Sequence, residues 1–132
     1  AARLAVARAD ELLPLLRQRH AEHARYAEEL RDAGPTPDAA LLRAYLEADL
    51  SFHRAILDGS GNRFLIQMAQ HISTHGHRLR QFVDTRDIDA EFAVAEHQRV
   101  LEAFDVGDAE AAATAMADHI DAVRARTVGA AG

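Results

Sequence analysis

Asp49 and His53 are the residues of this sequence whose types and spacing most clearly suggest chemistry. Four positions apart on a helix, they project from the same side, one turn from each other. That side also carries Leu46, Phe52 and Ile56, so both polar groups are expected to point toward a core. A carboxylate and an imidazole in apolar surroundings are unfavourable unless something pairs with them. Their partners must come from elsewhere in the chain.

Two further histidines fall on inward stripes of helical patterns. His97 precedes Val100 by one turn, and His119 follows Met116 by three positions. A turn at Gly107 separates the two segments, ten residues after His97 and twelve before His119. At a rise of about 1.5 Å per residue, antiparallel packing places the two histidines about 3 Å out of register. They are therefore predicted to face each other across a helical bundle.

One carboxylate and three imidazoles that converge inside a bundle are typical of a divalent-metal site with nitrogen and oxygen ligands. A single core histidine is more often a neutral ring bonded to a backbone carbonyl, but four such groups on three inward stripes favour the metal. The expected ligands are Asp49, His53, His97 and His119. Zinc is the first expectation for the single ion, with Ni, Mn, Fe and Co open. Paired Glu-x-x-His motifs of di-iron bundles are absent.

The remaining histidines give weaker signals. His20 and His23 share their surroundings with charged residues, and we expect them mainly on a solvated face. His71 is expected toward solvent. His75 lies near the apolar stripe of its helix and is a reserve candidate for lining a pocket or supplying an extra ligand.

Composition indicates one globular, all-helical domain. The chain has 132 residues, 48% of them apolar and 27% charged, with no cysteine and a formal net charge of −6. These values exclude a disulfide scaffold and argue against binding of nucleic acid by this domain. No apolar run reaches the roughly 18 residues of a membrane span. We expect a cytoplasmic protein.

The apolar periodicity predicts an antiparallel bundle of about six helices, all-α, around a central metal and ligand cavity. Residues 1–9 are interpreted as the last turns of a truncated first helix, and Asp10 as the cap of the second. The other predicted helices span about 10–32, 38–59, 62–83, 90–105 and 109–126, with a polar break at 84–89.

An enzyme is not the expected function. No serine is framed by a histidine and an acid, and Gly59-Ser60-Gly61 is too short for a phosphate loop. A metal-dependent hydrolase or lyase with the same ligands would need a separate general base. Glu96 is next to His97 in the sequence, but it does not suit that role, because neighbouring residues point about 100° apart on a helix. A purely structural helical dimerisation domain is the third alternative.

Four motifs, in order, resemble the FCD-type effector domain of GntR-superfamily bacterial transcription regulators. They are Asp49-x-x-Phe52-His53-x-Ala55-Ile56, Gly61-Asn62-x-x-Leu65, Glu96-His97-x-x-Val100-Leu101-x-Ala103 and Gly107-Asp108-Ala109-x-x-Ala112-x-x-Ala115-Met116-x-x-His119-Ile120. Each motif is loose alone, but together they cover nearly the whole chain.

The resemblance implies that the same Asp and three His bind a divalent metal, and that this metal holds a small carboxylate or hydroxy-acid effector. Arg78 falls where an arginine often anchors the acid. The resemblance further implies a homodimer whose DNA binding belongs to winged helix-turn-helix heads preceding the effector domain. Residues 1–132 are expected to be the single effector domain, without that head.

Overall fold

The computed structural model describes the backbone of residues 1–80 and 90–131 and the side chains of residues 1–72 and 90–128. Within this part of the chain all regular structure is helical and no strand occurs, which confirms the predicted fold class. The elements are α1 (Ala2–Ala5), a 3-10 turn (Val6–Arg8), α2 (Ala9–Ala33), α3 (Ala39–Gly59), α4 (Arg63–Arg80), α5 (Ala90–Asp105) and α6 (Ala109–Ala131).

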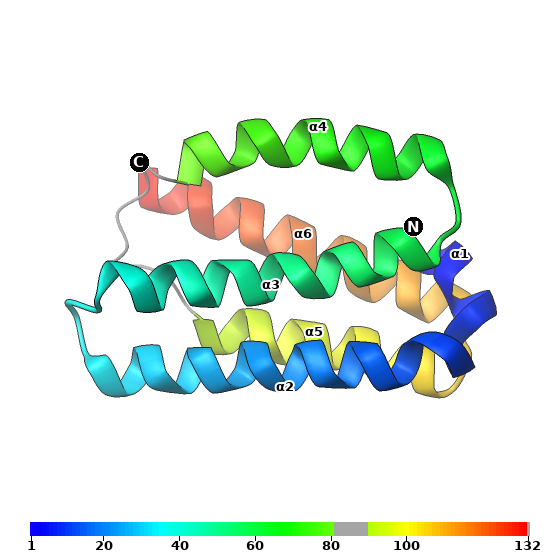
Figure 1. Ribbon diagram of the computed structural model, residues 1–132, viewed down its shortest axis with the longest axis horizontal. Coiled ribbons are helices and arrows are strands. Elements are labelled where there is room, and N and C mark those ends of the chain that lie inside the picture. Colours follow the sequence, from blue (N-terminus) through cyan, green and yellow to red (C-terminus); the bar gives the residue numbers. More distant parts are fainter. Residues whose placement is uncertain (81–89, 132) are drawn as a thin grey trace.

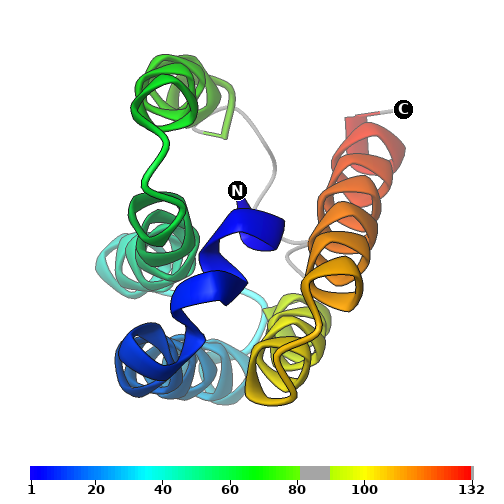
Figure 2. The same cartoon turned by 90° about the vertical axis from the view of Figure 1, so that its right-hand side faces the viewer.

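The long helices run side by side along one axis (Figure 1). Seen end-on, α4, α3, α2, α5 and α6 follow one another along a U-shaped path, and α1 crosses one end (Figure 2). Helix α2 packs against α3 and α5, and α5 packs against α6, whereas α4 contacts mainly α3. The chain therefore has a compact arrangement of α2, α3, α5 and α6, with α4 alongside.

Side-chain caps explain three of the helix starts. Asp38, Asn62 and Asp108 each accept hydrogen bonds from backbone N–H groups of the next turn, at 2.9 to 3.2 Å. Such caps satisfy donors that lack partners inside the helix. The predicted cap at Asp10 is wrong, because α2 begins at Ala9 and places Asp10 in its first turn. Helix α6 also continues to Ala131, beyond its expected end near residue 126.

The turn between α5 and α6 fixes the relative height of the two helices. Gly107 adopts φ +70°, a left-handed conformation that glycine reaches without steric strain. The N–H of Gly107 donates to the Phe104 carbonyl at 3.1 Å, and the N–H of Asp108 donates to the Ala103 carbonyl at 3.0 Å. These two bonds form a Schellman motif. A Gly-Asp pair thus ends one helix and starts the next within two residues.

Two apolar clusters stabilise the bundle. The larger one centres on Leu16, Phe52, Ile56, Val100 and Phe104, all nearly inaccessible to solvent. A smaller cluster is made by buried Ala27, Tyr45 and Ala90. Along α3, Asp49 lies between Tyr45 and Phe52, and along α5, His97 lies between Ala90 and Val100. The polar site is therefore held within the core on both sides.

The 3.6-residue period of the sequence predicts inward positions for three apolar residues that are exposed in the structure. Met68 and Ile72 on α4 are 61% and 66% exposed, and Ile120 on α6 is 55% exposed. Periodicity indicates that a helix has an apolar face, but a neighbouring helix must cover that face, and α4 has few neighbours. The expected break at 84–89 lies outside the described residues. In the described part of the chain, no helix is long and apolar enough to cross a membrane.

The cap at Asp108 provides a test of the α5–α6 turn. Replacing Asp108 by Ala should lower the free energy of unfolding by about 1 kcal/mol, because the Ala111 N–H loses its acceptor. Chemical denaturation followed by circular dichroism measures the change. Asp118→Ala, an exposed position in the middle of the same helix, is the control and should leave stability unchanged or slightly higher. Equal stability of both variants would contradict the assigned cap.

Candidate metal centre

The structure brings the four predicted ligand residues together. Asp49 and His53 come from α3, His97 from α5 and His119 from α6. One ligand atom from each lies within 4.8 Å of all the others. Asp49, His97 and His119 are buried, and the His53 side chain is 22% exposed. Three helices thus direct one carboxylate and three imidazoles at a common point.

The three imidazoles face one another through the same ring atom. The Nε2 atoms of His53, His97 and His119 are separated by 3.1 Å, 3.1 Å and 3.2 Å. A neutral ring nitrogen is either a donor or an acceptor. Three nitrogens in a triangle therefore cannot form a hydrogen bond along every edge. If all three present lone pairs, their repulsion is relieved by a cation at the centre, so this donor set fits a divalent metal.

Asp49 adds negative charge beside this triangle. Its Oδ1 atom lies 3.5 Å from Nε2 of His97 and 3.8 Å from Nε2 of His53. A buried carboxylate is unfavourable without compensating charge, and a cation among the imidazoles would supply it. The group could therefore hold a metal ion, and its composition does not select one metal.

Glu96 and Arg126 orient His119 from behind. The Glu96 carboxylate accepts a 2.6 Å hydrogen bond from Nδ1 of His119 and bonds of 2.7 and 3.0 Å from the Arg126 guanidinium. The tautomer with its proton on Nδ1 has its lone pair at Nε2, the atom that faces the cluster. Carboxylates of this kind commonly support metal-binding histidines. From the sequence, Glu96 was expected to matter only as a possible general base, although its spacing to Ala93 and Val100 places it on the inward stripe.

Burial and ion pairing shift the protonation of Glu96 in opposite directions. Burial raises the pKa of Glu96, but hydrogen bonds from Arg126 and His119 outweigh burial, so the pKa lies below its ordinary value. The carboxylate is therefore ionised at neutral pH. Its charge keeps the proton of the His119 ring on Nδ1.

His97 is the most enclosed of the three imidazoles. Its ring is inaccessible to solvent and stacks on Phe52, with centroids 4.2 Å apart and planes 14° apart. Burial lowers the pKa of His97 far below its usual range, and the nearby His53 and His119 lower it further. A neutral imidazole is the form that binds metals. No described group forms a hydrogen bond with its Nδ1.

The expectation of a solvated face is wrong for His23. The His23 ring is inaccessible to solvent and its Nε2 lies 3.7 Å from Oδ1 of Asp49. Burial lowers its pKa to about 4, against the opposing effect of Asp49. His20 is half-buried and its Nε2 lies 3.1 Å from the Val94 carbonyl. His23 falls on the same helical stripe as Leu16 and Ala27, which α3 and α5 cover where they pack against α2.

The side chains of His75 and Arg78 lie outside the described residues, so their predicted roles at a pocket stay predictions. The His71 side chain is exposed on α4, as expected.

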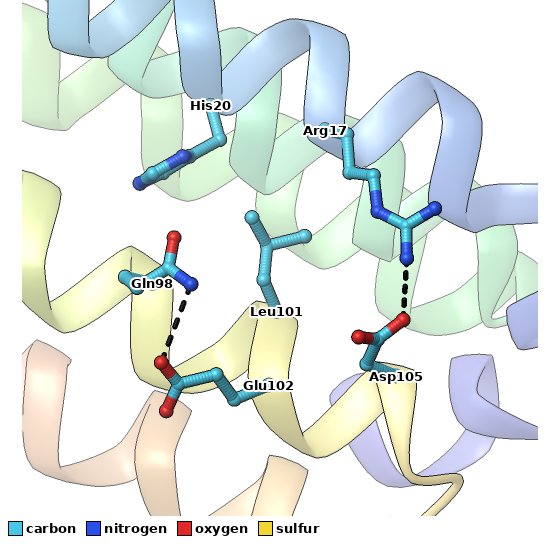
Figure 3. A pocket seen from close by; sticks show the side chains of 6 residues that line it. All are labelled: Arg17, His20, Gln98, Leu101, Glu102 and Asp105. Atoms are coloured by element: carbon cyan, nitrogen blue, oxygen red, sulfur yellow. Dashed lines mark hydrogen bonds and ion pairs between the residues drawn. The ribbon is translucent and has the colours of Figure 1, made fainter.

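A separate hollow of about 260 Å³ lies between α2 and α5 (Figure 3). An ion pair between Arg17 and Asp105 closes one side, and Gln98 donates a 3.3 Å hydrogen bond to Glu102 on the other. His20 and Leu101 complete its wall. None of the four clustered residues lines this hollow. It is therefore not the space around the candidate metal centre.

The fold and this site define an all-helical domain with an Asp/His cluster in its interior. Residues 1–122 match the model of the FCD domain. The chain therefore belongs to the FCD family, the C-terminal domain of GntR-family regulators, as the motifs indicated. Members of this family are regulatory, effector-binding domains rather than catalytic ones. Searches of curated proteins and of solved structures gave no match.

Glu96→Gln tests the support of His119. A neutral amide does not balance the charge of Arg126. Its oxygen is also a weaker hydrogen-bond acceptor than a carboxylate for the Nδ1–H of His119. We expect the affinity for Zn²⁺ to fall about 10- to 100-fold, as is usual for loss of a supporting carboxylate. Chelator competition measures the affinity. Glu102→Gln, an exposed position on the same helix, should leave it unchanged. An unaltered affinity in Glu96→Gln would show that the carboxylate does not support the site.

The two neutral, buried histidines predict loss of stability in acid. Because His23 and His97 have lowered pKa values in the folded state, unfolding takes up protons below pH 6.5, the ordinary histidine value. Stability of the metal-free domain is therefore full above that pH and decreases as the pH falls toward about 4, where His23 itself titrates. Each group contributes a slope of up to about 1.4 kcal/mol per pH unit.

Urea denaturation in the presence of a chelator, between pH 7.5 and 4.5, measures this slope. His23→Leu should make the dependence of stability on pH shallower by the contribution of one histidine. A stability that is constant between pH 7 and 5 would contradict neutral burial of these rings.

Proposed function

We propose that this domain is a metal-dependent small-molecule sensor of a transcription regulator. Asp49, His53, His97 and His119 would hold one divalent transition metal, with zinc as the first candidate and Ni, Mn, Fe or Co as alternatives. The observation that carries the proposal is the triangle of three Nε2 atoms beside the Asp49 carboxylate. When bound, the metal would supply positive charge and free coordination positions for oxygen atoms of a small carboxylate or hydroxy-acid effector.

The chain's own residues would convert occupancy of this site into a change of helix packing. The four ligands belong to α3, α5 and α6, so each helix contributes to a common point. A ligand shifts a conformational equilibrium only if it interacts differently with the two states. Groups from three helices around one centre supply such a difference, because any relative displacement of the helices changes the ligand set.

Regulation of DNA binding would then act through the rest of the parent protein. The net charge of −6 makes this domain itself unsuited to the DNA backbone. We propose a cytoplasmic homodimer whose winged helix-turn-helix heads bind DNA and whose arrangement depends on effector occupancy. Residues 1–132 would form the single effector domain of that protein. Family membership supports this role.

The environment of Glu96 argues against the hydrolase or lyase alternative. A metal-bound water would need a general base within hydrogen-bond reach. The Glu96 carboxylate is already bonded to His119 and Arg126. Its role in this geometry is to orient a ligand residue.

His53→Ala provides the sharpest test. His53 is the most accessible imidazole of the cluster, at 22% side-chain exposure, so its removal should disturb packing least. We expect the wild-type domain to bind one equivalent of Zn²⁺ and the variant to bind it more than about 100-fold more weakly, beyond the effect of losing a supporting partner. Calorimetric titration measures this, followed by titration of the Zn²⁺-loaded protein with citrate, malate and lactate.

Binding of an acid should occur in the Zn²⁺-loaded wild type and be lost in His53→Ala. The control His20→Ala removes a histidine that bonds a backbone carbonyl outside the cluster and should bind both as the wild type does. Equal metal and acid binding by wild type and His53→Ala would refute the proposed function.

A further inference from the structure

His23 is a buried histidine of α2. Its ring is inaccessible to solvent, and neither ring nitrogen forms a hydrogen bond with the described residues. The ring packs against Tyr45 and His97, with centroids 4.8 Å away in both cases. The ring therefore packs against its neighbours in the core, but no described hydrogen bond compensates for the burial of its two nitrogens.

An apolar residue would be the simpler choice at this position. The same stripe of α2 carries Leu16 and Ala27, which are buried among other apolar side chains. Enclosing a polar group without a hydrogen-bond partner is unfavourable. A histidine here lowers the stability of the metal-free fold unless its nitrogens serve another purpose.

The carboxylate of Asp49, which lies close to the ring, indicates what role the His23 nitrogens have. Nε2 of His23 lies 3.7 Å from Oδ1 of Asp49, the oxygen that also lies 3.5 Å from Nε2 of His97. This separation is too long for a full hydrogen bond but suits an N–H dipole directed at a carboxylate. His23 does not belong to the group of ligand atoms within 4.8 Å of one another. It stands next to the cluster without being one of its ligands.

We propose that His23 is a positioning residue that directs its Nε2–H at the Asp49 carboxylate and holds Asp49 against the three imidazoles for metal binding. This inference rests on the proposed function, because it assigns His23 a role toward the same metal. A carboxylate has about four lone-pair sites, so one that binds a metal still needs donors for the others. Glu96 supports His119 from α5, and His23 supports Asp49 from α2.

His23→Leu separates this role from a purely structural one. We expect the affinity for Zn²⁺, measured by chelator competition, to fall about 10- to 100-fold. The metal-free variant should unfold at the same temperature as the wild type or higher, because an unpartnered polar ring is gone. His23→Gln keeps an N–H donor and should recover part of the affinity. His20→Leu, one turn away on the same helix, is the control and should bind Zn²⁺ as the wild type does.

Three results are informative against the proposal. Unchanged affinity in His23→Leu, with wild-type binding intact, overturns the role of His23 and leaves the proposed function standing. If His23→Leu also unfolds more easily without metal while its affinity for Zn²⁺ is unchanged, His23 contributes only to packing. A wild-type domain that binds no Zn²⁺, Ni²⁺, Co²⁺, Mn²⁺ or Fe²⁺ refutes the proposed function and this inference with it.

A measurement on the unaltered protein decides the matter even if His23→Leu does not fold. In the domain loaded with ¹¹³Cd²⁺ and labelled with ¹⁵N in histidine, three imidazoles should show direct metal–nitrogen coupling. His23 should show none, and its proton should reside on Nε2. Metal coupling to His23 would make it a ligand and overturn the positioning role, as would a proton on Nδ1 alone.

Discussion

The structure depends on the convergence of three imidazole nitrogens on one point inside an apolar core. Nitrogens about 3 Å apart in a closed triangle cannot satisfy one another by hydrogen bonding. The surrounding fold must therefore hold an arrangement that its own polar groups do not stabilise. Phe52 stacks on His97, and the apolar clusters enclose the site along the bundle. Such an arrangement of nitrogens is favourable around a bound cation and unfavourable as part of an empty, packed core.

Support for this centre is distributed over four helices. Helix α3 supplies a carboxylate and an imidazole one turn apart, and α5 and α6 each supply one imidazole. On α5, Glu96 determines which nitrogen of His119 carries the proton and is itself held by Arg126 of α6. Helix α2 places His23 beside Asp49. His23 and Glu96 are buried together with Asp49, His97 and His119, so the geometry of the site is part of the packing of the bundle.

A site whose residues are part of the packed core suits a regulatory domain of the FCD family. In a separate pocket on a rigid scaffold, a ligand could bind without altering the scaffold. Here the candidate ligands are contributed by the helices whose contacts make the core, and a change at the centre has to be accommodated by α3, α5 and α6 together. The hollow between α2 and α5 has no such connection, because its polar residues face one another near the surface (Figure 3).

Local sequence determined the helices, most of their caps, the Asp49–His53 pair and the register of His97 with His119. All of these follow from the 3.6-residue period and from a tight turn at Gly107, which involve only neighbouring residues. Tertiary structure decided that His23 contacts Asp49, that Glu96 contacts His119 and Arg126, and that Met68, Ile72 and Ile120 are exposed. Burial depends on which helices lie against a face, and residues distant in sequence decide that.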